Sequence, residues 1–237
     1  MTHPVRRVAI LAPMRPELRP LLHRLCLRRE GSGGDALHRG AVGRVEIVAT
    51  TTGIGTRAAA RATERVLSST PVDHILVVGI AGGIGPGVAI GDLVVPELVV
   101  DLATGREHRP CPVGDSAPRG TLVTSDGLLV DRDEIARLER RGVVAIDMET
   151  ASIAAVCERR GCPWSVFRAI SDRAGDASVD QAVLGLAGPD GGPNLPALAR
   201  FLLSQPWRVP QLARLARDMR RATQRAASAA AEALERM

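Results

Sequence analysis

Aromatic side chains are scarce in this chain of 237 residues: they make up 2% of it, and Tyr is absent. Proteins that bind single-stranded nucleic acid stack bases on aromatic rings, so this composition argues against a nucleic-acid partner. The formal net charge of +5 does not change that conclusion, because the 31 basic residues are scattered along the chain. All of them are Arg, and we attribute the absence of Lys to genomic base composition.

Cysteine is also scarce, and its spacing suits neither a metal nor a disulfide framework. The four residues, Cys26, Cys111, Cys157 and Cys162, form no C-x-x-C pair, and Cys157 and Cys162 have no His at ligand spacing. We therefore expect structural thiols in a reducing compartment, no metal site and no cofactor.

Long hydrophobic runs are missing as well. The apolar segment near the N-terminus spans only about eight residues and lacks a cleavage signal, so it predicts neither a signal peptide nor a membrane-spanning helix. These features predict a cytoplasmic protein.

Apolar residues, 45% of the chain, instead form short buried runs that alternate with helical patterns. The expected strands are 8–14, 36–38, 44–50, 74–78, 93–100, 121–124, 143–146 and 165–170. The expected helices are 16–25, 58–67, 131–141, 147–160, 197–204 and 209–230. This alternation predicts an α/β fold with a single domain over 1–237, whose mixed, mostly parallel sheet is flanked by helices as in a three-layer sandwich. We expect a loop at 104–120, a Gly/Pro linker at 188–196, a core at 7–187 and a C-terminal helical extension at 194–237.

Polar residues gather where three of these strands end, which is where α/β sheets bind their ligands. Glu17 follows the first strand, Asp147 and Glu149 follow a later one, and Asp172 follows the strand at 165–170. Each has a structural alternative, since a carboxylate stabilises the first turn of a helix and Asp147 fits a helix N-cap.

Together with the glycines, these clusters carry a family resemblance. The order V-A-I-L-A-P-M-x-x-E, T-T-G-I-G-T, G-I-A-G-G-I-G, G-D-L-V-V, A-I-D-M-E-T and V-F-R-A-I-S-D resembles the nucleoside phosphorylase/nucleosidase superfamily. The methylthioadenosine/S-adenosylhomocysteine nucleosidases are its most similar well-known branch. The resemblance runs from Val8 to about Ser178 and implies an enzyme that cleaves the N-glycosidic bond of a 5′-substituted adenosine.

The resemblance also implies roles for individual residues. Asp172 would be the general acid that protonates N7 of the leaving purine, with Arg168 and Ser171 orienting its carboxyl group. Glu149 would accept hydrogen bonds from the ribose hydroxyls, and Glu17 would hold the attacking water. Further substrate contacts are expected from Met148, Gly82, Leu128 and Leu129. These roles suit the chemistry, because cleavage at an anomeric carbon passes through an oxocarbenium-like state that negative charge stabilises.

Three departures from the family pattern leave alternatives open. Ile80 occupies a position where better-known members have Ser, and Leu128 and Leu129 replace an aromatic residue beside the purine. Arg15, Gly53 and Arg57 could bind phosphate at a Gly-rich turn, so phosphorolysis is the alternative to hydrolysis. A non-catalytic nucleoside-binding module is an alternative of another class.

The C-terminal tail resembles the hopanoid-associated branch of the superfamily, whose members remove adenine from adenosylhopane. In the helix at 209–230, Leu212, Leu215 and Met219 form one stripe, while the opposite face carries several Arg. We expect a small-molecule nucleoside substrate and a homodimer, with either a solvated helix or a peripheral membrane contact through this face.

Overall fold

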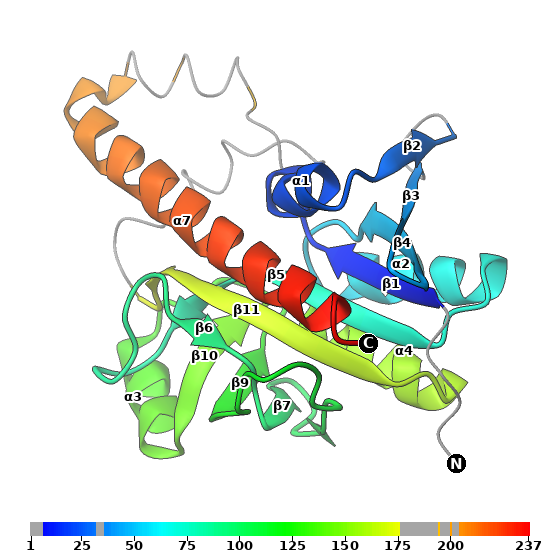
Figure 1. Ribbon diagram of the computed structural model, residues 1–237. Coiled ribbons are helices and arrows are strands. Elements are labelled where there is room, and N and C mark those ends of the chain that lie inside the picture. Colours follow the sequence, from blue (N-terminus) through cyan, green and yellow to red (C-terminus); the bar gives the residue numbers. More distant parts are fainter. Residues whose placement is uncertain (1–6, 32–35, 176–193, 195–199, 201–203) are drawn as a thin grey trace.

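The computed structural model describes residues 7–31, 36–175, 194, 200 and 204–237, and these form one α/β unit around a single mixed sheet (Figure 1). Its strands are β1 (Arg7–Ala12), β2 (Arg28–Glu30), β3 (Leu37–Val42), β4 (Val45–Thr51), β5 (His74–Gly83), β6 (Leu93–Val94), β7 (Leu98–Asp101), β8 (Glu107–His108), β9 (Thr121–Thr124), β10 (Val143–Asp147) and β11 (Trp164–Arg173). β5 lies at the centre, with β1 and β11 parallel to it on either side. The predicted mixed, mostly parallel sheet is confirmed.

Helices cover both faces of this sheet, as the three-layer prediction requires. The helices are α1 (Arg15–Arg24), α2 (Thr56–Ser69), α3 (Arg132–Arg140), α4 (Thr150–Arg160) and α7 (Val209–Leu234), with a short 3-10 turn η1 (Pro206–Arg208) before α7. α1 and α7 pack on one face around one apolar core, and α2 and α4 pack on the other around a second core. The predicted first helix is confirmed as α1: Leu18 and Leu21 are fully buried, and Pro16 lies in its first turn, where the missing N–H breaks no helical hydrogen bond.

Several predicted boundaries were wrong. The strand expected at 74–78 continues through the glycine motif to Gly83. The strand expected at 93–100 is interrupted between β6 and β7 at Pro96, which has no N–H to donate to a neighbouring strand. The helix expected from Asp147 begins at Thr150, because Asp147 still belongs to β10. β2 was not predicted, and β8 lies in the segment expected to be a loop.

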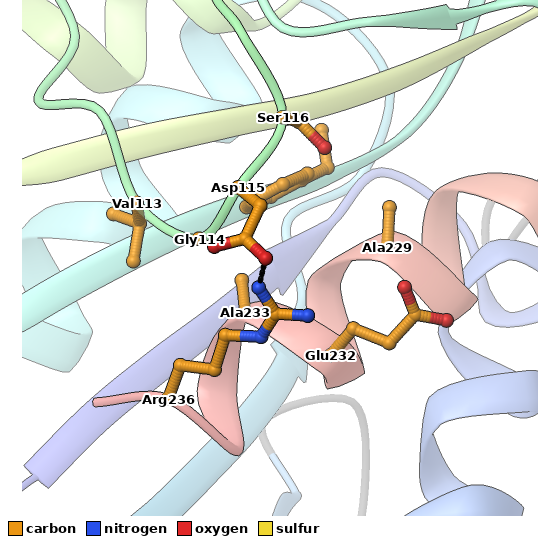
Figure 2. Close-up of a pocket in the computed structure, with 9 residues that line it drawn as sticks. Val113, Gly114, Asp115, Ser116, Ala229, Glu232, Ala233 and Arg236 are labelled. Carbon is orange, nitrogen blue, oxygen red and sulfur yellow. Dashed lines mark ion pairs between the residues drawn. The ribbon is translucent and has the colours of Figure 1, made fainter.

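The C-terminal helix α7 is anchored by its second half. From Ala222 onward, small side chains are buried against β5 and β11, and the helix ends beside the loop that carries Asp115 (Figure 2). Arg236 forms an ion pair with Asp115, and a Cβ at Gly114 would lie only 3.1 Å from the Cβ of Ala233. The crevice between them measures about 140 Å³, which is below the roughly 300–1,000 Å³ of small-molecule sites.

Some predictions concern residues outside this description. The predicted linker at 188–196 and helix at 197–204 lie there apart from Asn194, Arg200 and Ser204. Within the described residues, no helix has the length and apolar character needed to cross a membrane.

We predict that Ala230→Leu destabilises the protein by about 1–3 kcal/mol, because Ala230 is fully buried and extra methyl groups overpack a dense core. Ala213→Leu on the exposed surface of the same helix is the matched control and should change stability by less than about 0.5 kcal/mol. Urea unfolding of both variants measures the difference. Equal midpoints would contradict the packing described for α7.

Candidate active site

A cavity of about 1530 Å³ opens at the C-terminal ends of β1, β5, β10 and β11, where the sequence placed its polar clusters. It brings together most of the predicted site residues: Arg15, Glu17, Gly82, Leu128, Leu129, Met148, Glu149, Ser171 and Asp172. Its size exceeds the roughly 300–1,000 Å³ of ordinary ligand sites, so it can hold a nucleoside together with a sizeable substituent.

Arg168 lies beneath the cavity floor, with its side chain fully buried. Its Nη2 is 2.6 Å from Asp147 Oδ2 and 3.3 Å from Glu149 Oε2, and its Nη1 is 3.8 Å from Glu17 Oε2. Nη1 also donates a 3.3 Å hydrogen bond to the Ile80 carbonyl. Burial by itself lowers the pKa of Arg168, but the three carboxylates outweigh it and raise the pKa above its ordinary value. Arg168 is therefore a charged anchor for Glu17, Asp147 and Glu149. From the sequence we expected it to orient the carboxyl group of Asp172, but its ion pairs are with these three acids instead.

Glu17 reaches the floor from the first turn of α1. Its Oε2 accepts a 2.8 Å hydrogen bond from the Ile80 N–H, while its Oε1 is buried and has no partner among the described residues. Burial raises the pKa of Glu17 to about 8, although Arg168 acts in the opposite direction. Glu17 thus has one oxygen held in place and one available to a small polar molecule.

The close approach of Glu17 and Arg168 depends on Gly79 in β5. A Cβ at this position would overlap Glu17 Oε2 and Arg168 Nη1. The glycine motif therefore belongs to the strand, where it makes room for two charged side chains.

Glu149 is buried beside the same guanidinium. Its Oε1 accepts a 2.9 Å hydrogen bond from the Gly55 N–H, which comes from the loop before α2. Burial raises the pKa of Glu149 to about 7; Arg168 lowers it, and Asp147 raises it further. A carboxyl group poised near neutral pH is a common feature of functional sites.

Asp147 anchors this cluster, a role that the sequence reasoning missed. Its Oδ1 accepts hydrogen bonds from Thr124 Oγ1 at 2.7 Å and, at 3.3 Å, from the N–H groups of Glu149 and Thr150. The N-cap of α4 is nevertheless Glu149, so the N-cap position considered for Asp147 from the sequence was wrong. Its position two residues before Glu149 was the available signal, because both carboxyl groups sit at one strand end.

Asp172 lies near the end of β11, which has a register shift between Ile170 and Asp172. Such irregularities redirect side chains near the end of a strand. Buried Ser171 donates a hydrogen bond to Asp172 Oδ1, and the half-buried Asp172 lines the cavity. A Cβ at Gly82 would lie 3.7 Å from Asp172 Oδ2, so this glycine keeps the surroundings of the carboxyl group open.

The predicted phosphate ligands are not brought together. Arg15 is exposed and lines the cavity, whereas the exposed Arg57 and Gly53 are not among the lining residues. The Gly53 N–H is occupied, since it donates a 3.0 Å hydrogen bond to the Pro13 carbonyl.

Part of the cavity wall comes from α7, which sequence reasoning did not connect with the site. Leu212, Leu215 and Met219, the stripe recognised in the sequence, face the cavity opposite Leu18 and Leu22 of α1. Helical periodicity located the stripe, but it could not reveal what the stripe contacts. The described residues contain no group of His, Cys, Asp or Glu that could hold a metal ion.

Comparison with known proteins agrees with this architecture. The family model for the phosphorylase superfamily matches residues 7–117 and 114–204. The 5'-methylthioadenosine/S-adenosylhomocysteine nucleosidase of Geobacillus kaustophilus is 30% identical over 207 residues, which cover 73% of this chain and 86% of that protein. The nucleosidase of the same name from Chromohalobacter salexigens is 29% identical over 205 residues, covering 73% and 87%.

Solved structures show the same fold at lower identity. A Helicobacter pylori 5'-methylthioadenosine/S-adenosyl homocysteine nucleosidase has a TM-score of 0.74 and 19% identity, covering 99% of this chain and 100% of its own. The H. pylori futalosine hydrolase has a TM-score of 0.73 and 20% identity, and both chains are covered completely.

The chain belongs to the phosphorylase superfamily. Within it, the chain is an enzyme that cleaves N-glycosidic bonds. The alternative of a non-catalytic binding module is thereby set aside.

We predict that Gly79→Ala lowers kcat/KM by about 100-fold, because a displacement of about 1 Å at reacting groups costs that much. The added methyl group would push Glu17 and Arg168 apart. Gly87→Ala is the matched control, since a Cβ there meets nothing within 4 Å. Steady-state kinetics on 5′-methylthioadenosine measures both variants, and equal activity would contradict the geometry described around Gly79.

Proposed function

We propose that this enzyme hydrolyses a 5′-substituted adenosine and releases adenine, with Asp172 as general acid and Glu17 holding the attacking water. The observation that carries the proposal is the unpartnered Glu17 Oε1 at the floor of the cavity that Asp172 also lines. An acid on one side and a water-holding carboxyl on the other supply both proton transfers of the reaction.

The adenine side of the proposed reaction uses Asp172, Ser171 and the leucines. Asp172 donates its proton to N7 as the C1′–N9 bond breaks, and the bonding electrons leave with the base. Ser171 orients the carboxyl through its hydrogen bond. The half-buried Leu128 and Leu129 line the cavity and would enclose the ring by apolar contact, while Gly82 leaves room beside the acid.

The sugar side uses Glu149, Met148 and Glu17. Glu149 accepts hydrogen bonds from the ribose hydroxyls, Arg168 orients its carboxyl group, and Met148 packs under the ring. Glu17 removes a proton from water as the water oxygen bonds to C1′. The negative charge of these carboxylates stabilises the positive charge that develops on the sugar.

Phosphorolysis is the second candidate, and Arg15 is the residue in its favour because it lines the cavity. Arg57 is exposed and does not line the cavity, and the Gly53 N–H already donates a hydrogen bond to the Pro13 carbonyl. Both observations favour water over phosphate as the nucleophile.

The wall formed by α1 and α7 supports a 5′ substituent with apolar character. Leu22, Leu212, Leu215 and Met219 offer apolar surface, and the cavity volume exceeds what a nucleoside fills. A short thioether, as in methylthioadenosine or S-adenosylhomocysteine, and a long hydrocarbon, as in adenosylhopane, are both compatible with this wall. We also propose that the protein forms homodimers, the commonest symmetric assembly.

Adenine release from 5′-methylthioadenosine in phosphate-free buffer tests the proposal. We predict a free-sugar product and a rate independent of added phosphate, and a loss of roughly 100-fold or more in Asp172→Asn, which keeps the shape but removes the transferable proton. Asp133→Asn, on the exposed surface of α3, is the control and should keep full activity. A ribose 1-phosphate product would show that the enzyme is a phosphorylase rather than a hydrolase. Normal turnover in Asp172→Asn would contradict the role of Asp172 as general acid.

The pH dependence follows from the two buried carboxyl groups. Glu17 and Glu149 act in their ionised forms and have pKa values of about 8 and about 7, so protonation switches the enzyme off as the pH falls. We predict that kcat/KM rises from pH 6 to about 8.5 as Glu17 and Glu149 ionise, and that these two groups cause no further rise above that pH. Because the two carboxyl groups interact, the apparent pKa values describe the pair and not either residue alone. In Glu17→Gln the residual activity should lose the upper of the two transitions. A profile already flat above pH 5 would be incompatible with this assignment.

A further inference from the structure

The charged residues that line the cavity are sorted by depth. The carboxyl groups of Glu17, Asp147 and Glu149 are buried at the floor. Asp172 is half-buried, and the exposed ionisable side chains of the lining are all of basic type: Arg15, Arg19, His23, Arg29, Arg173 and Arg220. Arg19, Arg173 and Arg220 place positive charge at the mouth, and no exposed carboxylate is among its described lining residues.

Four of the five exposed large hydrophobic side chains lie at the cavity or at the start of α7. The exposed large hydrophobic residues of the described chain are Ile54, Ile90, Val130, Trp207 and Val209. Ile54 and Val130 line the cavity, while Trp207 and Val209 lie at the start of α7, with 71% and 46% of their surface exposed. This end of α7 projects away from the sheet (Figure 1). Trp is enriched at boundaries between apolar and aqueous surroundings, because its ring is apolar and its N–H is polar.

The first half of α7 adds further positive charge behind this tip. Residues 206–221 contain five Arg and one acidic residue, Asp218. Arg214, Arg217 and Arg221 are exposed on the face opposite Leu212, Leu215 and Met219. At about 1.5 Å per residue, Arg214 follows Trp207 by roughly 10 Å. Apolar groups at interfaces enter a bilayer by about 5–10 Å, so this spacing brings Arg214 to headgroup level when Trp207 is inserted.

We propose that the tip of α7 and the cavity mouth dock on an anionic lipid bilayer. Trp207 and Val209 enter the interface, and the Arg side chains of α7 and of the mouth contact phosphate and carboxylate headgroups. The apolar stripe of α7 then runs from the bilayer into the cavity, which gives a nucleoside with a lipid-like 5′ substituent a continuous path to the floor. That last step rests on the proposed function, whereas docking itself does not require a substrate.

Co-sedimentation with vesicles tests the docking without any nucleoside. The full chain is mixed with vesicles of phosphatidylcholine alone or with phosphatidylserine, at low and at high salt. We expect binding to the anionic vesicles at low salt and its loss at high salt, since salt screens exposed charges. Because an Arg near an anionic surface contributes about a fivefold increase in binding and Arg214 lies at headgroup level, the triple variant Arg214→Gln/Arg217→Gln/Arg221→Gln should bind at least about fivefold more weakly. Trp207→Ala should also weaken binding.

The matched control removes the same charge from the opposite face of the sheet. Arg61→Gln/Arg65→Gln/Arg159→Gln changes exposed residues of α2 and α4 and should bind nearly as the unchanged protein does. Equal binding by both triple variants, or no binding to anionic vesicles at low salt, would overturn the proposal. If the unchanged protein does not bind vesicles and Trp207→Ala changes the molar mass measured by light scattering, the tip of α7 contacts a second copy of the chain instead.

Activity on a soluble substrate separates the two proposals. The triple variant at Arg214, Arg217 and Arg221 should still release adenine from 5′-methylthioadenosine at the normal rate. If the triple variant loses vesicle binding and still releases adenine at the normal rate, the three Arg residues act in docking and not in catalysis. Absence of adenine release from the unchanged protein, with vesicle binding intact, would count against the proposed function and leave the docking in place.

Discussion

The buried guanidinium of Arg168 is the interaction on which the active site depends. It contacts Asp147, Glu149 and Glu17, which come from β10, the start of α4 and α1. Removing one partner of a buried ion pair typically costs about 3–5 kcal/mol, because the other charge is left without compensation. The three acids are therefore energetically tied to one side chain, and through it to the central strands β5 and β11.

One positive charge cannot neutralise three buried carboxylates. The negative charge that is left over favours protonation of the carboxyl groups at the cavity floor. Desolvation raises the pKa values of Glu17 and Glu149 into the neutral range, even with Arg168 beside them. Asp172 lies outside this cluster, beside Ser171 and open to the cavity. Asp172 and the floor acids therefore occupy different environments, although both face the same cavity.

Local patterns predicted much of the fold. The apolar runs located most strands, and the helical patterns between and after them located α1, α2, α3, α4 and α7. The strand ends also identified Glu17, Glu149 and Asp172, because parallel strands bring their C-terminal ends to one edge. Asp147, Gly79 and the wall formed by α7 were missed. Their roles come from contacts between residues far apart in the sequence, which periodicity does not encode.

The helix α7 joins stability and specificity in one element. Its second half is rich in Ala because β5 and β11 approach it closely, and this packing fixes the helix direction. Its first half carries larger apolar side chains, which are only partly buried and line the cavity. Under the proposed function, the chemistry at the strand ends and the wall around the 5′ substituent therefore belong to different elements. Changes in the first half of α7 would then alter which substituent fits, while the charged floor that Arg168 organises would stay the same.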